Sequence, residues 1–343
     1  MFSRRHPLGL VGIIANPAAS KDIRRLVAQA RVIPDWEKVN TVRRVMLGLQ
    51  SVGVERVLAM PDSSNLVMRA ADDPGISIEP EFLDMPAFYS EGDTVRAAGL
   101  MAEQGVDSLV TLGGDGTNRA AVVGSKNIPM VAISTGTNNV FPSMVEGTLA
   151  GLAAGMVAED WFDLPDVAIP SKIMHVYVDG ELRDIALIDV ALSKERFVAS
   201  KAIWDMETLF EVFLTRAEPA SIGLSSIGAR LEAVSMADEG GLQYSIADPE
   251  VADSENFSVL APIAPGVVPR VGIFSWQRMA DGERLAIEKR NCTVALDGER
   301  AFSVNQSQLL EIEVKRNGPP VIDVNLALNV AAKQGLFNRS QGN

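Results

Sequence analysis

The stretch Leu112-Gly113-Gly114-Asp115-Gly116-Thr117-Asn118 joins an apolar run at 107–112 to a segment of helical periodicity at 117–124. Its closely spaced glycines let the backbone come within hydrogen-bonding distance of a bulky anion. A helix that begins here adds unpaired N–H groups and the positive end of its dipole. Bound phosphates repel Asp115 unless Mg²⁺ lies between them or the carboxylate takes a proton from an attacking hydroxyl. The stretch therefore predicts phosphoryl transfer.

A second interpretation stays open, in which the same stretch is only a tight strand-to-helix turn with Asp115 as its N-cap. In both interpretations we expect an exposed carboxylate that contributes little to folding stability. The sequence contains no G-x-x-x-x-G-K-[ST] and no G-x-G-x-x-G pattern, so a P-loop and a dinucleotide fingerprint of the hydride-transfer type are excluded.

Short apolar runs alternate with helical segments in the first 145 residues. The runs lie at 8–15, 56–60, 76–83, 107–112 and 130–134, and the helical segments at 40–52, 64–72, 90–104 and 117–124. Buried runs separated by helices are typical of a parallel sheet that is covered on both faces. We predict an α/β fold with a doubly wound parallel sheet.

The pattern changes near residue 146, where the chain becomes mostly antiparallel β. Turn pairs typical of hairpins occur at Asp179-Gly180, Asp281-Gly282 and Asp297-Gly298. Helices are expected at 148–158 and 201–215, the second with a buried face of Trp204, Leu209, Phe210, Val212 and Phe213. The stretch 223–228 is read as a loop. We predict a nucleotide-binding domain at 1–145, a β-rich substrate or oligomerisation domain at 146–323, and a closing helix at 324–343 that returns to the first domain.

Two more polar turns follow predicted strands. Ser134-Thr135-Gly136-Thr137-Asn138-Asn139 comes after one strand, and Asn16-Pro17-Ala18-Ala19 comes after the first strand. The carboxyl ends of parallel strands open onto one crevice, so these turns and the Gly113 turn should face one cleft. Asn138 and Asn139 offer donors and acceptors there, although asparagine is also an ordinary turn residue.

Composition excludes several classes of protein. The chain has 343 residues, 47% hydrophobic and 22% charged, with a net charge of −13, which repels nucleic acid. One cysteine and two histidines rule out an internal disulfide and a His-rich zinc site. No apolar run is long enough to span a bilayer. The apolar 8–15 stretch is interpreted as a buried strand rather than a secretory signal. We expect a cytoplasmic protein.

Four motifs in this order and spacing give the chain a family resemblance: Asn16-Pro17, Gly113 to Thr117, Gly136 to Asn139, and Leu296-Asp297-Gly298-Glu299. They resemble the superfamily of NAD kinases and diacylglycerol or sphingosine-type lipid kinases. The Gly-Thr-Asn-Asn-Val-Phe form and the Asp-Gly-Glu ending look most like the ATP-NAD kinase-like branch named after acetoin-catabolism protein X. The similarity covers nearly the whole chain.

The resemblance implies a site between a nucleotide-binding domain and a β-rich domain. ATP would lie on the loop of Gly113, Gly114, Gly116, Thr117 and Asn118, and Asp115 would be the essential carboxylate that activates the acceptor hydroxyl or engages Mg²⁺. The turn of Gly136, Thr137, Asn138 and Asn139, together with Asn16, would complete the nucleotide site.

Three further positions bear on the acceptor. Glu299 is either a second carboxylate at the phosphoryl centre or an exposed acid of a hairpin turn, and Asp189 is either an acceptor for a ribose hydroxyl or a strand-end charge. NAD kinases place an Asn-Glu pair where this chain has Ile188-Asp189. We therefore expect weakened NAD binding that Ile188→Asn should strengthen. Lipid kinases end the second glycine turn in Asn-Asp, whereas this chain has Asn138-Asn139.

The leading hypothesis is an Mg²⁺-dependent small-molecule kinase that transfers a phosphoryl group from ATP to the 2'-hydroxyl of the adenosine ribose of NAD, giving NADP. The alternatives are a lipid kinase, which the acidic balance disfavours at anionic membranes, and a nucleotide sensor without turnover. The expected partners are small molecules and further copies of the chain in a homo-oligomer, without nucleic acid and without stable membrane association.

Overall fold

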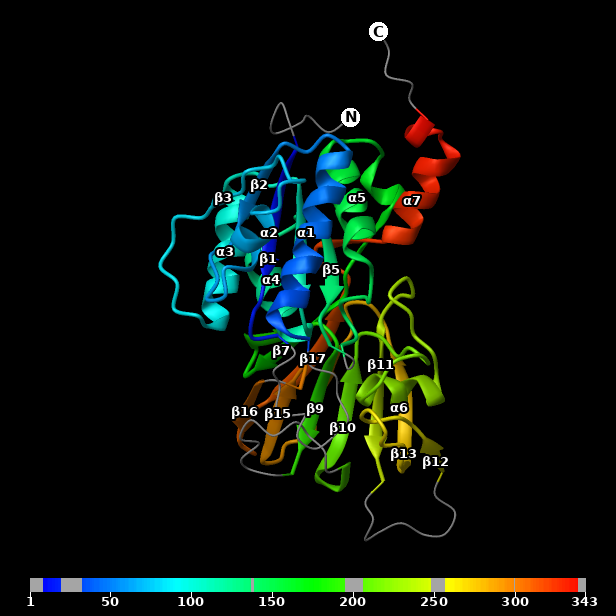
Figure 1. Cartoon of the computed structure of the whole chain (residues 1–343). Helices are drawn as coiled ribbons and strands as arrows, with labels where there is room; N and C mark the ends of the chain where they lie inside the picture. Colours follow the sequence, from blue (N-terminus) through cyan, green and yellow to red (C-terminus); the bar gives the residue numbers. More distant parts are fainter. Residues whose placement is uncertain are drawn as a thin grey trace.

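The computed structural model describes residues 9–19, 33–136, 139–194, 206–247, 257–298 and 300–338. They form two regions, one above the other in Figure 1, with the glycine-rich turns at the level where the two meet. Within the described ranges, no helix combines the length and the apolar character that crossing a bilayer requires.

The upper region contains a seven-stranded sheet in the order β3-β2-β1-β4-β5-β18-β6. Strands β1 to β5 and β18 are parallel to their neighbours, and β6 is antiparallel to β18. The strands are β1 (Leu10–Ala15), β2 (Arg56–Ala59), β3 (Glu81–Phe82), β4 (Ser108–Gly113), β5 (Met130–Ser134), β6 (Ala168–Pro170) and β18 (Pro320–Ile322). The predicted parallel sheet is confirmed, but the predicted strand at 76–83 shortens to the two residues of β3.

Helices cover both faces of this sheet, as the doubly wound prediction requires. Side chains of α1, α2, α5 and α7 share one apolar cluster, and side chains of α3 and α4 share the other. The helices are α1 (Asp35–Ser51), α2 (Leu66–Ala71), α3 (Glu91–Glu103), α4 (Asp115–Ser125), α5 (Gly147–Ala158) and α7 (Val324–Lys333). The carboxylate of Asp93 accepts the Ser90 N–H at 3.1 Å and Gly105 takes a φ of +74°, so α3 begins and ends where its sequence predicts.

The lower region packs two antiparallel sheets against each other. The larger has the order β12-β13-β11-β10-β9-β15-β16, and the smaller has the order β14-β17-β7-β8. The larger sheet contains β9 (Asp189–Ser193), β10 (Leu209–Leu214), β11 (Gly241–Ile246), β12 (Ser258–Leu260), β13 (Arg270–Met279), β15 (Cys292–Leu296) and β16 (Arg300–Val304). The smaller contains β7 (Ile173–Val178), β8 (Glu181–Ala186), β14 (Arg284–Ala286) and β17 (Leu310–Lys315).

Short helical elements complete the chain. They are α6 (Leu224–Leu231), which covers the outer face of the larger sheet, and the 3-10 turns η2 (Leu164–Asp166), η3 (Met206–Thr208) and η4 (Leu336–Asn338). The stretch 223–228, which the sequence suggested was a loop, therefore begins a helix.

The predicted helix at 201–215 is wrong from residue 209 onward, because Leu209–Leu214 is the strand β10. Its side chains serve two cores: Phe213 packs between the two sheets, whereas Val212 and Leu214 pack under α6. Apolar residues that alternate between two buried faces imitate a helical stripe in sequence. Trp204 lies outside the described residues.

Apolar side chains join the two regions. Leu187 and Ile188, between β8 and β9, are buried in the same cluster as Phe141 and the side chains of α3 and α4. The closing helix α7 lies beside α5 in Figure 1, and its Ala327 and Ala331 are fully buried there. The chain therefore returns to the first sheet at its end.

Candidate active site

Three turns meet at the carboxyl edge of the parallel sheet, as the sequence predicts. The register pairs Ala15 with Leu112 and Gly113 with Ser134, so β1, β4 and β5 end side by side. The backbone N–H of Asn16 donates to the Leu112 carbonyl at 3.0 Å. The Thr135 amide donates to the Gly113 carbonyl at 3.2 Å.

Side chains lock these turns to each other. Asn16 Nδ2 donates to Thr117 Oγ1 at 2.8 Å, which ties the first turn to the start of α4. A Cβ atom on Gly113 would lie 2.5 Å from Thr117 Cβ, so glycine is needed there to let helix and strand approach. Both Gly114 and Gly136 face the amide of Asn139, which leaves little room for a side chain at either position.

The side chain of Asn118 supports the turn from inside. It is fully buried; its Oδ1 accepts from Thr111 Oγ1 at 2.5 Å, and its Nδ2 donates to the Gly114 carbonyl at 2.8 Å. Both ends of the amide are therefore engaged within the protein. The side chain of Asn118 therefore holds the glycine turn, and its contact with the nucleotide stays a prediction.

Asp115 is the first residue of α4, and its carboxylate turns toward the loop that follows β5. Oδ1 accepts the N–H groups of Val140 at 3.1 Å and Phe141 at 2.8 Å. The N-cap is Gly114, without a side-chain cap bond, so Asp115 does not cap its own helix. The side chain is 8% exposed, which corrects the expectation of an exposed carboxylate. Two backbone donors therefore fix its orientation.

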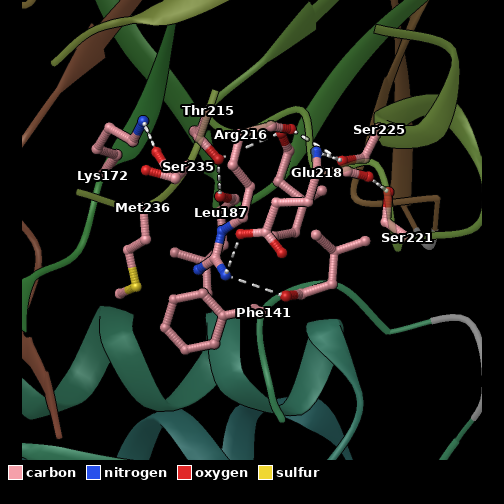
Figure 2. Close-up of polar contacts among 12 residues, drawn as sticks. Phe141, Lys172, Leu187, Thr215, Arg216, Glu218, Ser221, Ser225, Ser235 and Met236 are labelled. Atoms are coloured by element: carbon pink, nitrogen blue, oxygen red, sulfur yellow. Dashed lines mark hydrogen bonds and ion pairs between the residues drawn. The ribbon is translucent and has the colours of Figure 1, made fainter. Parts of the chain in front are cut away.

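An arginine of the lower region reaches the same loop from the other side. Arg216, two residues after β10, donates from Nη1 to the Val140 carbonyl at 3.1 Å and lies 5.4 Å from the centre of the Phe141 ring (Figure 2). The same Nη1 is 3.6 Å from Glu218 Oε1. Burial lowers the pKa of Arg216, while the negative charges of Glu218 and Asp115 act in the opposite direction. Nothing in the sequence pattern singled out Arg216.

A buried lysine organises the first turn. Lys38 of α1 is 1% exposed, and its Nζ donates to the carbonyls of Pro17 at 2.6 Å and Ala19 at 2.8 Å. Its Nζ is also 3.7 Å from Asp35. Helix α1 therefore holds the turn that carries Asn16.

We expect Lys38→Met to lower the free energy of unfolding by about 1–3 kcal/mol, because two carbonyls of a partly buried turn lose their charged donor. Urea unfolding of the variant measures this loss. Lys333→Met, at an exposed lysine of α7, is the control and should change stability by less than about 0.5 kcal/mol. Equal values for the two variants would show that the Lys38 contacts do not hold the turn.

Asp297 is the buried acid of the lower region. It is 4% exposed, and its Oδ1 accepts the N–H groups of Leu187 at 3.1 Å, Ile188 at 2.8 Å and Asp189 at 3.2 Å. Burial raises the pKa of Asp297, and these three hydrogen bonds act in the opposite direction. Asp297-Gly298 does turn between β15 and β16, as predicted, but Asp297 also fixes the backbone between β8 and β9.

The position of Ile188 overturns one expectation. Its side chain is 1% exposed and packs in the apolar cluster shared by the two regions. Ile188→Asn would therefore place an amide in the core rather than at a ligand, so the reason for expecting a gain in NAD binding does not hold. Asp189 is half-buried at the start of β9. Burial raises the pKa of Tyr244, and the negative charge of Asp189 raises it further.

Three predicted site residues, Thr137, Asn138 and Glu299, lie outside the described residues. Within the part of the chain that the structure describes, no group of three or more His, Cys, Asp or Glu side chains is arranged to hold a metal ion.

Three cations hold the backbone of segment 235–240, which lies between α6 and β11. Lys172 Nζ donates to the carbonyls of Ser235 and Gly240, each at 2.9 Å. Arg278 donates to the carbonyl of residue 239, and Arg316 to those of residues 236, 237 and 238. Burial, and then the positive charges of Arg316 and other arginines, lower the pKa of Lys172 to about 7.

This pKa predicts a pH-dependent stability. Lys172 loses its proton near pH 7 when folded, but only near its ordinary value of 10.5 when unfolded. The unfolded chain therefore binds more protons between these limits, so folding stability should rise with pH there. The stability of the wild type relative to Lys172→Met should increase by roughly 1–3 kcal/mol from pH 6.5 to pH 9. Urea unfolding of both proteins measures it, and a pH-independent difference would show that Lys172 keeps an ordinary pKa.

Family models match both regions of the chain. Residues 11–161 match the ATP-NAD kinase N-terminal domain, and residues 172–317 match the acetoin catabolism protein X C-terminal domain. Over 340 residues the chain is 38% identical to acetoin catabolism protein X of Cupriavidus necator, across 96% of this chain and 94% of that protein. The chain belongs to the acetoin catabolism protein X family.

Membership of the acetoin catabolism protein X family agrees with the motifs that the sequence shares with this branch. The chain is also similar to two solved structures of Bacillus anthracis str. Sterne proteins, both named provisionally as diacylglycerol kinases. One is 13% identical with a TM-score of 0.49 and covers 93% of this chain and 98% of that chain. Another is 12% identical with a TM-score of 0.48 and covers 92% of this chain and 99% of that chain.

Proposed function

We propose that this member of the acetoin catabolism protein X family is an ATP-dependent small-molecule kinase, with the adenosine-ribose 2'-hydroxyl of NAD as its acceptor. The observation that carries the proposal is the placement of Asp115. Its carboxylate lies at the N-terminus of α4, directly after the glycine turn, and two amides of the neighbouring loop fix its orientation. A carboxylate beside an anion-binding turn suits phosphoryl transfer, because it can take the acceptor proton or hold a metal.

The residues at this edge fit Mg²⁺ with a nucleotide. Proteins commonly bind Mg²⁺ through one or two carboxylates together with substrate phosphates, and Asp115 supplies one such carboxylate. When bound, Mg²⁺ would neutralise charge on the phosphates. Asn16, Gly113, Gly114, Gly116, Thr117, Gly136, Thr137, Asn138 and Asn139 are the proposed nucleotide-binding residues.

In this proposal, different groups of the protein bind the phosphates, orient Asp115 and bind the acceptor. The first amides of α4 face the phosphates, and the bond from Asn16 to Thr117 holds the helix start in place. Val140 and Phe141 orient Asp115 so that it can accept the proton of the acceptor hydroxyl. Glu299 is the proposed second carboxylate and Asp189 the proposed acceptor for a ribose hydroxyl.

A ligand-shift experiment tests the class of substrate. The melting temperature of the purified protein is measured with ATP, NAD, NADP and diacylglycerol-containing vesicles, each with and without Mg²⁺. A ligand present at about 100 times its dissociation constant adds about 2.7 kcal/mol to stability. We expect a rise with ATP and with NAD. A rise with the vesicles alone would favour a lipid kinase, and no rise with any nucleotide would contradict the proposal.

The setting of the enzyme is also part of the proposal. We expect a cytoplasmic protein, on the basis of its single cysteine. We also propose that it forms a homo-oligomer, with small molecules as its other partners. Light scattering after size-exclusion chromatography measures the oligomeric state. A mass equal to one chain would contradict this expectation.

A further inference from the structure

Arg216 contacts the loop that follows β5 from the lower region, and Asp115 contacts the same loop from the upper region. Asp115 holds the N–H groups of Val140 and Phe141, while Arg216 holds the Val140 carbonyl and covers the Phe141 ring. Asp115 and Arg216 therefore contact the same two residues, one from each region of the fold. The negative charge of Asp115 also acts to raise the pKa of Arg216, against the larger effect of burial.

The guanidinium of Arg216 has more donors than the structure uses. A guanidinium carries five N–H donors. Both described polar contacts of the Arg216 guanidinium, with Val140 and Glu218, involve Nη1. Across the described ranges, no hydrogen bond reaches its Nε or Nη2. The residue is only 7% exposed. Arg216 already pairs with Glu218, and its remaining N–H donors can bind the oxygens of a further anion.

Other basic side chains lie in this part of the lower region. Lys172 and Arg216 appear in one group of side chains in Figure 2. Arg316, Arg216 and Arg278 all lower the pKa of Lys172, and Asp238 is the acid that acts in the opposite direction. The contacts of segment 235–240 place Arg316 and Arg278 around the same loop as Lys172. In a chain with a net charge of −13, these cations gather around segment 235–240.

We propose that Arg216 binds a phosphate group of the substrate, using the guanidinium nitrogens that face away from Val140. The planar fork of a guanidinium matches two phosphate oxygens, which an ammonium cannot do. This assignment rests on the proposed function, because it needs a phosphorylated ligand at the Asp115 turn. That phosphate belongs either to the donor nucleotide or to the acceptor dinucleotide, and binding measurements separate the two sources.

The test compares Arg216→Met and Arg216→Lys with the wild type by isothermal titration calorimetry. The probes are ADP, NAD and adenosine, all in the presence of Mg²⁺. Arg216→Met should weaken ADP or NAD binding roughly 10- to 100-fold and leave adenosine binding unchanged. Arg216→Lys should give a smaller loss, since it keeps the charge but not the fork. Arg230→Met, at an exposed arginine of α6, is the matched control and should match the wild type.

Each outcome decides between named alternatives. A loss for ADP places the phosphate on the donor, and a loss for NAD alone places it on the acceptor. Wild-type affinity for both in the Arg216 variants, or an equal loss for adenosine, overturns the assignment. Absence of ADP and NAD binding by the wild type instead contradicts the proposed function. Arg216→Lys can keep the bond to Val140, so it decides the question if Arg216→Met does not fold.

Discussion

Replacing Asp115 with asparagine should lower phosphoryl-transfer turnover by roughly 100- to 10,000-fold, the range expected when a general base is removed. The variant should also lose stability. Asp115 Oδ1 and Oδ2 both accept backbone N–H groups, and an asparagine amide would present an N–H₂ group to one of these donors. A buried donor without an acceptor costs about 1–3 kcal/mol. Steady-state kinetics and urea unfolding measure the two effects.

Asp62→Asn is the matched control for this prediction. Asp62 is also 8% exposed, and its carboxylate also accepts two backbone N–H groups, from Ser64 at 2.8 Å and Leu66 at 2.9 Å. We expect a similar loss of stability in both variants but near-normal turnover in Asp62→Asn. Full turnover in Asp115→Asn would reduce Asp115 to a structural residue of the turn.

Replacing Asp297 with alanine should cause a large loss of stability. Three consecutive backbone N–H groups, of residues 187–189, would lose their acceptor in a buried region. We expect a decrease of about 3 kcal/mol or more in the free energy of unfolding. This value already allows for the cost of burying the Asp297 charge, which the alanine variant no longer has. Asp297→Asn keeps one oxygen acceptor and should lose about half as much.

The comparison variant is Asp281→Ala, in a second Asp-Gly turn of the lower region. Asp281 is exposed, and its carboxylate accepts the backbone N–H of Arg316 at 2.8 Å. Its loss should stay below about 1 kcal/mol. Urea unfolding of the three variants would contradict the account if Asp281→Ala and Asp297→Ala were equally destabilised.

The sequence predicts the upper sheet well, because its signals are local. Apolar runs such as Leu10–Ala15 separated by helical segments indicate parallel strands, and the polar turns then share one edge by geometry. Residues 209–214 show where this reasoning fails. Apolar side chains on both faces of β10 have no alternating pattern, so a strand and a helix cannot be separated by periodicity.

The partners of the site side chains were beyond prediction for a different reason. Asp115 accepts the N–H groups of Val140 and Phe141, which lie 25 or more residues further along the chain. Asp297 accepts the N–H groups of residues 187–189, which lie 108 or more residues before it. Tertiary packing alone brings these groups together. The two aspartates had the signals of exposed turn residues, and only the folded arrangement shows them buried.

The central claim, phosphoryl transfer to NAD that depends on Asp115, is tested most directly by measuring NADP formation. Purified protein is incubated with ATP, NAD and Mg²⁺, and NADP is quantified over time for the wild type, Asp115→Asn and Asp62→Asn. We predict steady NADP production by the wild type and Asp62→Asn, and a rate lower by roughly 100-fold or more for Asp115→Asn. NADP formation at equal rates in all three proteins, or in none of them, would contradict the claim.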